Sequence, residues 1–272
     1  TQADYVLYNI KNRFGGEIMN GVNVISHRGA NLVAPQNTIA AFEKSIEIGC
    51  DGFETDVHLS KDGIPVVCHN FTIDETSTGT GAIKNMTLEE LRQYDFGKYK
   101  SAEFEGTPIP TLDDFLEVSK KMGDKMKVLN IELKSEKFGE AGTEIVEKTI
   151  DAVKNHGLFD KLLISSFDPA ILVVCKKVDK NCKTGILYSP DNLISLKIAP
   201  RPVNFCKEIG ADALHPFFMY VTRLYVERAH RAGIQVNPWT VNKESTAKHL
   251  IKLGVDGLIT DNPGLMNQIL SK

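Results

Sequence analysis

Short β-rich runs alternate with longer amphipathic stretches almost to the end of the 272 residues, and this alternation constrains the fold most. Each stretch between two runs is long enough for a helix, which is the pattern of parallel strands joined by crossover helices. Eight alternations of a strand and a helix favour a closed (β/α)₈ TIM barrel over an open doubly wound sheet. The expected strands are 22–26, 52–57, 127–133, 162–166, 183–188, 211–215, 234–241 and 256–260.

Several stretches between the strands carry helix-end signals. Gly49 ends an apolar-periodic stretch that begins after Thr38, as left-handed C-caps prefer. Capping boxes or their Asp variant begin at Thr87 and Thr111, and Asp168 precedes a proline in the manner of an N-cap. No Gly-x-Gly-x-x-Gly fingerprint follows the first strand, which argues against a dinucleotide-binding sheet.

One connection is much longer than an ordinary βα loop. It begins after the second strand, where residues 64–68 predict an extra strand that returns from a Lys61-Asp62-Gly63 turn as a hairpin. We therefore expect residues 22–272 to form one barrel domain, with an insertion at about 64–110 that roofs the site. Residues 1–21 are expected to be an N-terminal extension.

The bulk composition excludes some partners. A net charge of −3 gives no basic footprint for nucleic acid, and no apolar run approaches the ~18 residues of a membrane span. The helices show no aromatic and basic membrane face, so small soluble substrates are favoured. The sequence gives no indication of the oligomeric state.

Cysteine usage and the opening segment favour a cytoplasmic location. The opening segment lacks the apolar core of a signal peptide. The five cysteines follow no Cys-x-x-Cys spacing, so we expect buried free thiols in a reducing compartment. They are Cys50, Cys68, Cys175, Cys182 and Cys206.

Side chains suited to catalysis and metal binding gather at the ends of the predicted strands. A spacing of two puts both members of a pair on one face of a strand, and the reactive groups of such barrels come from the C-terminal strand ends. Three carboxylates from neighbouring strands would meet around one cation, and oxygen ligands suit Mg²⁺ or Ca²⁺. With two imidazoles nearby, the pattern indicates metal-assisted hydrolysis of an anionic substrate. These residues are His27 and Arg28, Glu54 and Asp56, His69, and Glu132 and Lys134.

The ordered set of motifs resembles the glycerophosphodiester phosphodiesterase family, in its bacterial cytoplasmic type. The resemblance covers residues 22–265, and the motifs occur in the family's order. They are HRG at 27–29, P-x-N-T at 35–38, G-x-E-x-D at 52–56, V-x-x-H at 66–69, I-E-x-K at 131–134, PWTVN at 238–242 and DGLITD at 256–261.

The resemblance implies a (β/α)₈ barrel with a small insertion after the second strand. It also implies cleavage of glycerophosphodiesters to an alcohol and sn-glycerol 3-phosphate, with one divalent cation. By motif, His27 and His69 would be the acid–base pair, while Glu54, Asp56 and Glu132 would hold the metal. Arg28 and Lys134 would contact the phosphate and Trp239 the glycerol.

Position along the strands adds two candidates for the wall of the substrate pocket, Phe167 and His215, whereas His58 is expected at the surface. Four alternatives stay open from the sequence. Either histidine can be the base, and the nucleophile can be water or a substrate hydroxyl. A related lyase acting on lysophospholipids would release a cyclic phosphate, and a non-catalytic barrel would only bind the diester.

Three positions depart from the usual family pattern. Gln36 stands where Glu is usual, which lowers the local negative charge. Asn70 follows His69 where Asp is more common, which changes the orientation or basicity of that histidine. Residues 74–76 place acids in a segment that often carries Arg, which bears on headgroup preference.

Overall fold

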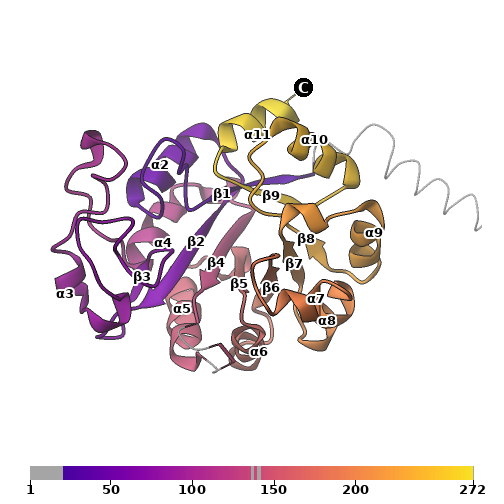
Figure 1. Ribbon diagram of the computed structural model, residues 1–272, viewed down its shortest axis with the longest axis horizontal. Coiled ribbons are helices and arrows are strands. Elements are labelled where there is room, and N and C mark those ends of the chain that lie inside the picture. The colour runs from indigo at the N-terminus through magenta and orange to yellow at the C-terminus, as the bar shows by residue number, and fades with distance from the viewer. Residues whose placement is uncertain (1–20, 136–137, 140–141, 272) are drawn as a thin grey trace, which may run out of the picture.

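The structure is a barrel of parallel strands surrounded by helices, so the predicted (β/α)₈ fold is confirmed (Figure 1). It is a computed structural model that describes residues 21–135, 138–139 and 142–271. The expected extension at 1–21 lies outside the described residues except for Gly21.

Eight strands form the barrel, in the order β8-β7-β6-β5-β4-β2-β1-β9, and each neighbouring pair in that order is parallel. β1 pairs with β9, so the first and the last strand of the chain lie side by side in the barrel. The strands are β1 (Asn23–His27), β2 (Gly52–Leu59), β4 (Val128–Leu133), β5 (Leu162–Ser166), β6 (Lys183–Tyr188), β7 (Ala213–Pro216), β8 (Gln235–Val236) and β9 (Gly257–Thr260).

The barrel closes between β8 and β9, and here the predicted strand 234–241 is too long. β8 has two residues, and the chain after it includes Pro238, which has no N–H to donate to a ladder. The backbone contact with β9 nevertheless continues. The amide of Ile259 donates to the carbonyl of Pro238 at 3.1 Å, and the amide of Val241 donates to the carbonyl of Ile259 at 2.9 Å.

The helices cover the outside of the barrel, and their ends follow the predicted signals. The Thr38 hydroxyl accepts from the amide of Ala41, and Gly49 ends the same helix with a φ of 88°. Thr111 forms the predicted capping box with Asp114. The helices outside the insertion are α2 (Ile39–Ile48), α4 (Leu112–Lys120), α5 (Thr143–Asn155), α6 (Pro169–Val178), α7 (Ser195–Ile198), α8 (Pro202–Glu208), α9 (Arg223–Arg231), α10 (Glu244–Leu253) and α11 (Pro263–Leu270).

The long connection after β2 is a small subdomain with its own apolar core. Its strand β3 (Pro65–Val67) pairs antiparallel with β2, which confirms the predicted hairpin. The connection then contains η2 (Ile83–Asn85), α3 (Leu88–Leu91) and η3 (Ala102–Phe104). Its core consists of Val66, Cys68, Ile73, Ile83, Leu91, Phe96 and Ile109.

This subdomain contacts the loop after β1 at the mouth of the barrel. The amide of Gln36 donates to the hydroxyl of Tyr99 at 2.9 Å. The ammonium of Lys100 donates to the carbonyl of Asn31 at 2.6 Å. The insertion therefore supports the loop that carries Arg28 and Gln36 into the site.

The large side chains of the core lie between the strands and the helices. Phe42, Phe53 and Phe115 pack with ring centroids 4.5–5.9 Å apart. Polar groups occupy part of the barrel interior, including the fully buried His215, whose Nε2 lies 3.2 Å from the amide nitrogen of Asn237. All five cysteines are buried free thiols, as the sequence predicted.

We expect buried His215 to make stability fall on acidification. Burial lowers its pKa from 6.5 to about 3, so the unfolded chain takes up a proton near pH 6.5 and the folded chain does not until about pH 3. Within that window the slope reaches about 1.4 kcal/mol per pH unit. Urea unfolding of His215→Gln between pH 7 and pH 4 should show a shallower slope than the parent protein. His249→Gln, at an exposed position on α10, should keep the parent slope, and equal slopes for the two variants would contradict this account.

Candidate active site

Three carboxylates meet at the mouth of the barrel. Glu54 and Asp56 are two residues apart on β2 and share a face, and Asp56 lies in register with Glu132 on β4. One oxygen from each lies within 4.8 Å of the others, and the residues are 4%, 0% and 7% exposed. The sequence correctly placed these three side chains together.

Two cations accompany the carboxylates. The Lys134 ammonium lies 2.8 Å from Asp56 Oδ1 and 2.5 Å from Glu132 Oε1. The Arg28 guanidinium lies 3.4 Å from Asp56 Oδ2 through Nε. If every group is ionised, three carboxylates and two cations leave one net negative charge in a buried place.

The pKa values show how unevenly that charge is held. Burial, together with the Asp56 charge, raises the pKa of Glu54 well above its usual range, and burial raises that of Glu132 to about 7. Burial opposes ionisation of Asp56 too, but the charges of Lys134 and Arg28 outweigh it and lower the pKa. A divalent cation would stabilise all three carboxylates in the ionised form, so the set fits a hard oxygen-ligated ion.

His27, at the end of β1, is oriented by the residue that follows β9. Its Nδ1 donates to Asp261 Oδ1 at 2.6 Å, because a carboxylate only accepts. That leaves Nε2 on the side of the carboxylates, 3.9 Å from Glu54 Oε2. Asp261 is itself held by Asn31 at 2.7 Å and Asn242 at 2.5 Å.

His69, after β3, is oriented in a similar way, by the side-chain amide of Asn70. The Asn70 side chain donates through Nδ2 to Glu75 at 2.8 Å, so its Oδ1 accepts from His69 Nδ1 at 2.6 Å. Burial lowers the pKa of His69 to about 4. Asn70 and Glu75, which both differ from the usual family pattern, thus form one chain of hydrogen bonds with His69. This chain fixes the orientation of the His69 ring and leaves its Nε2 free.

His58 is buried, so the expectation that it lies at the surface is wrong. It continues the alternation of β2, but the insertion covers this end of the strand. Its Nε2 lies 3.2 Å from the carbonyl of His69, and Phe71 packs on its ring at 5.0 Å. His58 therefore supports the backbone that carries His69.

Two residues of the P-x-N-T segment hold the cluster from the side. The side-chain oxygen of Gln36 accepts from Arg28 Nη1 at 2.6 Å. The amide therefore makes this contact at the position where the family usually has a Glu carboxylate. Asn37 donates to Asp56 Oδ2 at 2.8 Å and accepts from the Thr55 hydroxyl at 2.9 Å. Arg28 and Asn37 both have positive φ angles, 55° and 57°, so this loop adopts an uncommon backbone to bring them inward.

Aromatic rings form a wall beside the carboxylates. Trp239 packs edge-on against Phe167 at 5.6 Å and Phe217 at 6.2 Å, and its Nε1 donates to the carbonyl of His215 at 2.8 Å. The half-buried Phe167 and Trp239 are available to a ligand. The His215 side chain is 0% exposed behind this wall, and its contact with substrate stays a prediction.

Sequence reasoning missed Asp261, Asn242, Asn31 and Asn37 as site residues. Asp261, Asn242 and Asn37 lie inside motifs that it quoted, DGLITD, PWTVN and P-x-N-T, so motif membership was a signal for them. Asn31 lies close to the HRG motif at a position with no strand periodicity. The contacts of Asn31 and Asn37 become visible only when the loop after β1 is folded over β2 and β9.

We expect Asp261→Asn to lower turnover by about 10²-fold or more, because a neutral amide no longer stabilises the charged imidazole or fixes its tautomer. Burial, with the charge of Arg28, lowers the pKa of His27, and the hydrogen bond and charge of Asp261 oppose that lowering. Its removal should therefore move the acidic limb of the pH–rate profile to lower pH. Asp179→Asn, in a partly buried ion pair with Lys154, is the matched control. A D261N profile with an unmoved acidic limb would argue against this positioning role.

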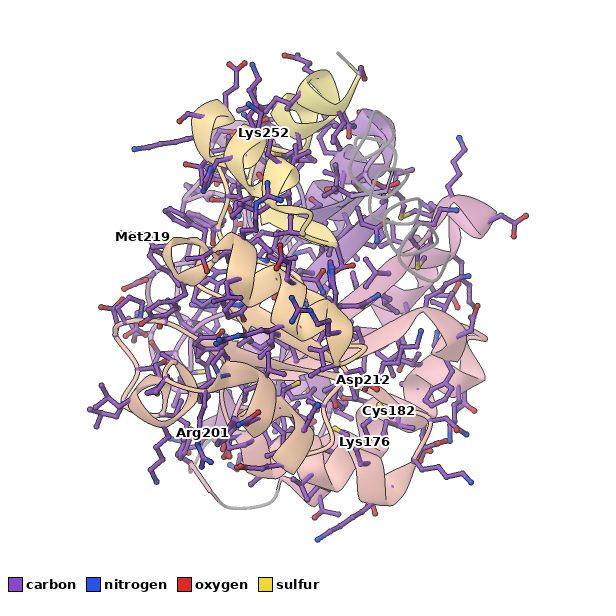
Figure 2. All side chains as sticks on the ribbon, turned by 90° about the vertical axis from the view of Figure 1, so that its right-hand side faces the viewer. Lys176, Cys182, Arg201, Asp212, Met219 and Lys252 are labelled. Carbon is purple, nitrogen blue, oxygen red and sulfur yellow. The ribbon has the colours of Figure 1, made fainter. Side chains whose placement is uncertain are left out.

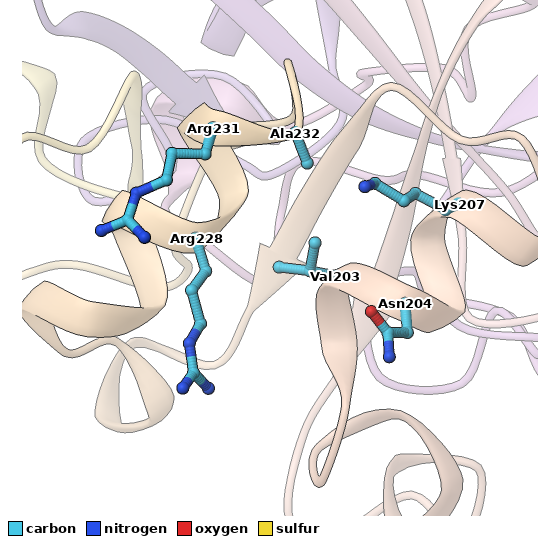
Figure 3. A pocket seen from close by; sticks show the side chains of 6 residues that line it. All are labelled: Val203, Asn204, Lys207, Arg228, Arg231 and Ala232. Carbon is cyan, nitrogen blue, oxygen red and sulfur yellow. The ribbon is translucent and has the colours of Figure 1, made fainter.

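Two surface hollows lie away from the mouth. One of about 390 Å³ lies between α8 and α9 and is lined by Lys207, Arg228 and Arg231 among others (Figure 3). The arginine head groups point away from Lys207, so the three cations do not converge on one ligand position (Figure 3). The other, of about 730 Å³, lies beside α4 and includes Arg92, Asp114 and Lys121. Within the described residues, no helix is long and apolar enough to span a membrane.

The fold and the site together define a TIM-barrel hydrolase with a buried acidic cluster between two oriented histidines. The chain belongs to the glycerophosphoryl diester phosphodiesterase family, whose model matches residues 27–265. It is accordingly a phosphoric diester hydrolase, and the family predicted from the motifs is confirmed.

Named relatives agree with this assignment. A glycerophosphodiester phosphodiesterase of Caldanaerobacter subterraneus subsp. tengcongensis is 39% identical, with 92% of this chain and 98% of that protein aligned. One from Bacillus altitudinis is 32% identical over 88% and 94%. Among solved structures, an Oleispira antarctica phosphodiesterase superposes with a TM-score of 0.82 at 30% identity, covering 93% and 98%. That structure contains the product sn-glycerol-3-phosphate.

Proposed function

We propose that the enzyme cleaves glycerophosphodiesters to an alcohol and sn-glycerol 3-phosphate, using one divalent cation and the pair His27 and His69. The observation that carries the proposal is the matched orientation of the two rings. Each Nδ1 is held by an acceptor, at 2.6 Å in both cases, and each Nε2 is left free to exchange a proton. The acidic cluster lies beside both.

The charges around the cluster suit a phosphodiester. Glu54, Asp56 and Glu132 would hold Mg²⁺ or Ca²⁺, and a bound cation would offset the charge that develops on the phosphoryl oxygens. The Arg28 fork suits two oxygens of the same phosphate, and Lys134 supplies a point charge beside it. The Trp239 and Phe167 rings offer an apolar face to the glycerol carbons.

The partners of the two histidines suggest a division of roles. Asp261 is anionic, so it stabilises the imidazolium that forms when His27 accepts a proton from the attacking hydroxyl. Burial lowers the pKa of His69 to about 4, and the hydrogen bond to the neutral Asn70 opposes that lowering only in part, so this ring holds a proton only when the anionic phosphodiester lies beside it. We assign His27 as the base and His69 as the acid that protonates the departing alkoxide.

Phosphorus NMR of the reaction products tests the function. The protein is incubated with glycerophosphocholine, glycerophosphoethanolamine and lysophosphatidylcholine, with and without a chelator. We expect glycerol 3-phosphate from the first two, and none in the presence of the chelator. Turnover that survives chelation would contradict the metal assignment. A persistent cyclic phosphate would favour the lyase reaction, in which the substrate's own hydroxyl attacks.

A further inference from the structure

Two consecutive residues of the insertion, Tyr99 and Lys100, hold the loop that joins β1 to α2. The hydroxyl of Tyr99 accepts from the amide of Gln36 at 2.9 Å, and the ammonium of Lys100 donates to the carbonyl of Asn31 at 2.6 Å. Gln36 and Asn31 lie toward the two ends of this loop, so the pair fixes it at two points. Tyr99 and Lys100 together are called the clamp.

The loop between β1 and α2 depends on such contacts for its shape. Arg28 and Asn37 have φ angles of 55° and 57°, in the left-handed region that residues other than glycine rarely adopt. Uncommon backbone conformations of this kind persist only where the surrounding structure fixes them. The clamp supplies two of the contacts that fix this loop.

The clamp is itself held by the insertion. Asp95 accepts from the amides of Gly97 and Lys98, at 2.7 Å and 3.0 Å, and so closes the turn that precedes the clamp. A Cβ at Gly97 would lie 1.9 Å from the carbonyl oxygen of Phe104, so this turn requires glycine. A group that positions another must be fixed by its own neighbours, and the clamp meets this condition.

Lys100 differs from many surface lysines in the kind of group that it contacts. Lys176, for example, pairs with the carboxylate of Asp212 at 2.6 Å on another face of the molecule (Figure 2). Surface ion pairs of this kind contribute little to stability. Lys100 donates instead to a main-chain carbonyl, so it fixes the position of Asn31.

Through Asn31, the Lys100 contact reaches the histidine at the end of β1. The Asn31 side chain donates to Asp261 Oδ1 at 2.7 Å and to the carbonyl of His27 at 3.0 Å. It therefore holds the main chain of His27 together with the carboxylate that orients the His27 ring. A shift of Asn31 would disturb both.

Through Gln36, the Tyr99 contact reaches the cation proposed to bind the phosphate. The Gln36 side-chain oxygen accepts from Arg28 Nη1 at 2.6 Å, and Arg28 Nε lies 3.4 Å from Asp56 Oδ2. Because Tyr99 fixes the main chain of Gln36, it also fixes where the Gln36 side chain meets the guanidinium. Burial raises the pKa of the Tyr99 phenol, so the hydroxyl keeps its proton at neutral pH and acts through hydrogen bonding.

We propose that Tyr99 and Lys100 are positioning residues of the reaction and that each sets one half of the site. Lys100 holds His27 for proton transfer, and Tyr99 holds Arg28 for the phosphate. The inference rests on the proposed diesterase function and adds to it two residues from outside the barrel. A clamp that only stabilised the fold would affect both halves alike.

Kinetics on glycerophosphocholine test the two halves separately. Lys100→Met should lower kcat by about tenfold with little change in KM, because a loosened ring slows the chemical step. Tyr99→Phe should raise KM about threefold or more with little change in kcat, because Arg28 binds the phosphate in the substrate and in the transition state alike. The matched controls, the exposed Lys98→Met and Tyr94→Phe beside the insertion core, should keep both parent values. The same change in kcat and KM for both clamp variants would overturn the proposal.

Two further variants separate positioning from a loss of folded protein. Lys100→Arg keeps a donor and should restore most of the parent kcat. In an Asn31→Ala background, Lys100→Met should cost little more, because the side chain that it positions is gone. Full multiplication of the Asn31→Ala and Lys100→Met losses would contradict the positioning role of Lys100.

Nuclear magnetic resonance of the His27 ring tests the Lys100 contact without catalysis. In protein labelled with ¹⁵N-histidine, the Nδ1 proton held by Asp261 should give a low-field signal that His27→Ala removes. Lys100→Met should broaden or remove this signal, and Lys98→Met should not. An unchanged signal in Lys100→Met would overturn this half of the proposal. Loss of the signal in Lys100→Met, in a protein that hydrolyses no diester, would contradict the diesterase function and support the clamp.

Discussion

Replacing His27 or His69 by alanine is expected to lower the hydrolysis of glycerophosphocholine by about 10²–10⁴-fold. The Nδ1 atom of each ring is held by its partner, Asp261 or Asn70, which cannot replace the ring, and His27 Nε2 lies 3.9 Å from Glu54. The measurement is kcat at saturating substrate and metal. His69→Ala should lose more than Asn70→Ala, because the latter removes only the orientation of the His69 ring, which remains.

Two comparisons make that result specific. His249→Ala, an exposed histidine on α10, should keep the parent kcat. The double variant His27→Ala, His69→Ala should lose little more than the weaker single variant, because residues that act as a unit are not additive. Full multiplication of the two single losses would show that the rings act in separate steps.

Replacing one carboxylate of the cluster should have opposite effects on metal binding and on stability. We expect Glu132→Gln or Glu54→Gln to weaken binding of Mg²⁺ or Ca²⁺ by about a hundredfold or more, since even indirect partners of metal ligands contribute 10–100-fold. The same Glu54→Gln change should raise metal-free stability at pH 7. Burial and Asp56 raise the pKa of Glu54, so its ionised form destabilises the fold above its unfolded pKa near 4.5.

Titration calorimetry and thermal unfolding with and without metal check both halves of this prediction. The parent protein should gain stability on adding metal, and Glu54→Gln should gain little. Glu117→Gln, on the exposed side of α4, should behave as the parent does in both measurements. A variant of the cluster with unchanged metal affinity would remove that residue from the ligand set.

Local signals explain why the barrel was predictable. The alternation of runs depends on which residues are apolar, and caps such as Thr38 and Asp168 depend on side chains within three positions. The acidic pair on β2 followed from strand periodicity alone. The predicted strand at 234–241 was too long, because Pro238 removes a backbone donor, which hydropathy does not register.

Long-range contacts explain what was missed. Asp261 reaches His27 across 234 positions, and no periodicity connects them. His58 looked exposed because its strand was expected to end at the surface, whereas the insertion packs Phe71 over it.

The pairing of β1 with β9 also determines when the barrel can form during synthesis of the chain. His27 is synthesised 234 positions before its partner Asp261, and β1 is likewise synthesised long before β9. A nascent chain that still lacks β9 therefore exposes an open sheet edge and an unheld histidine. The closed barrel and the oriented His27 ring can form only after β9 has been synthesised.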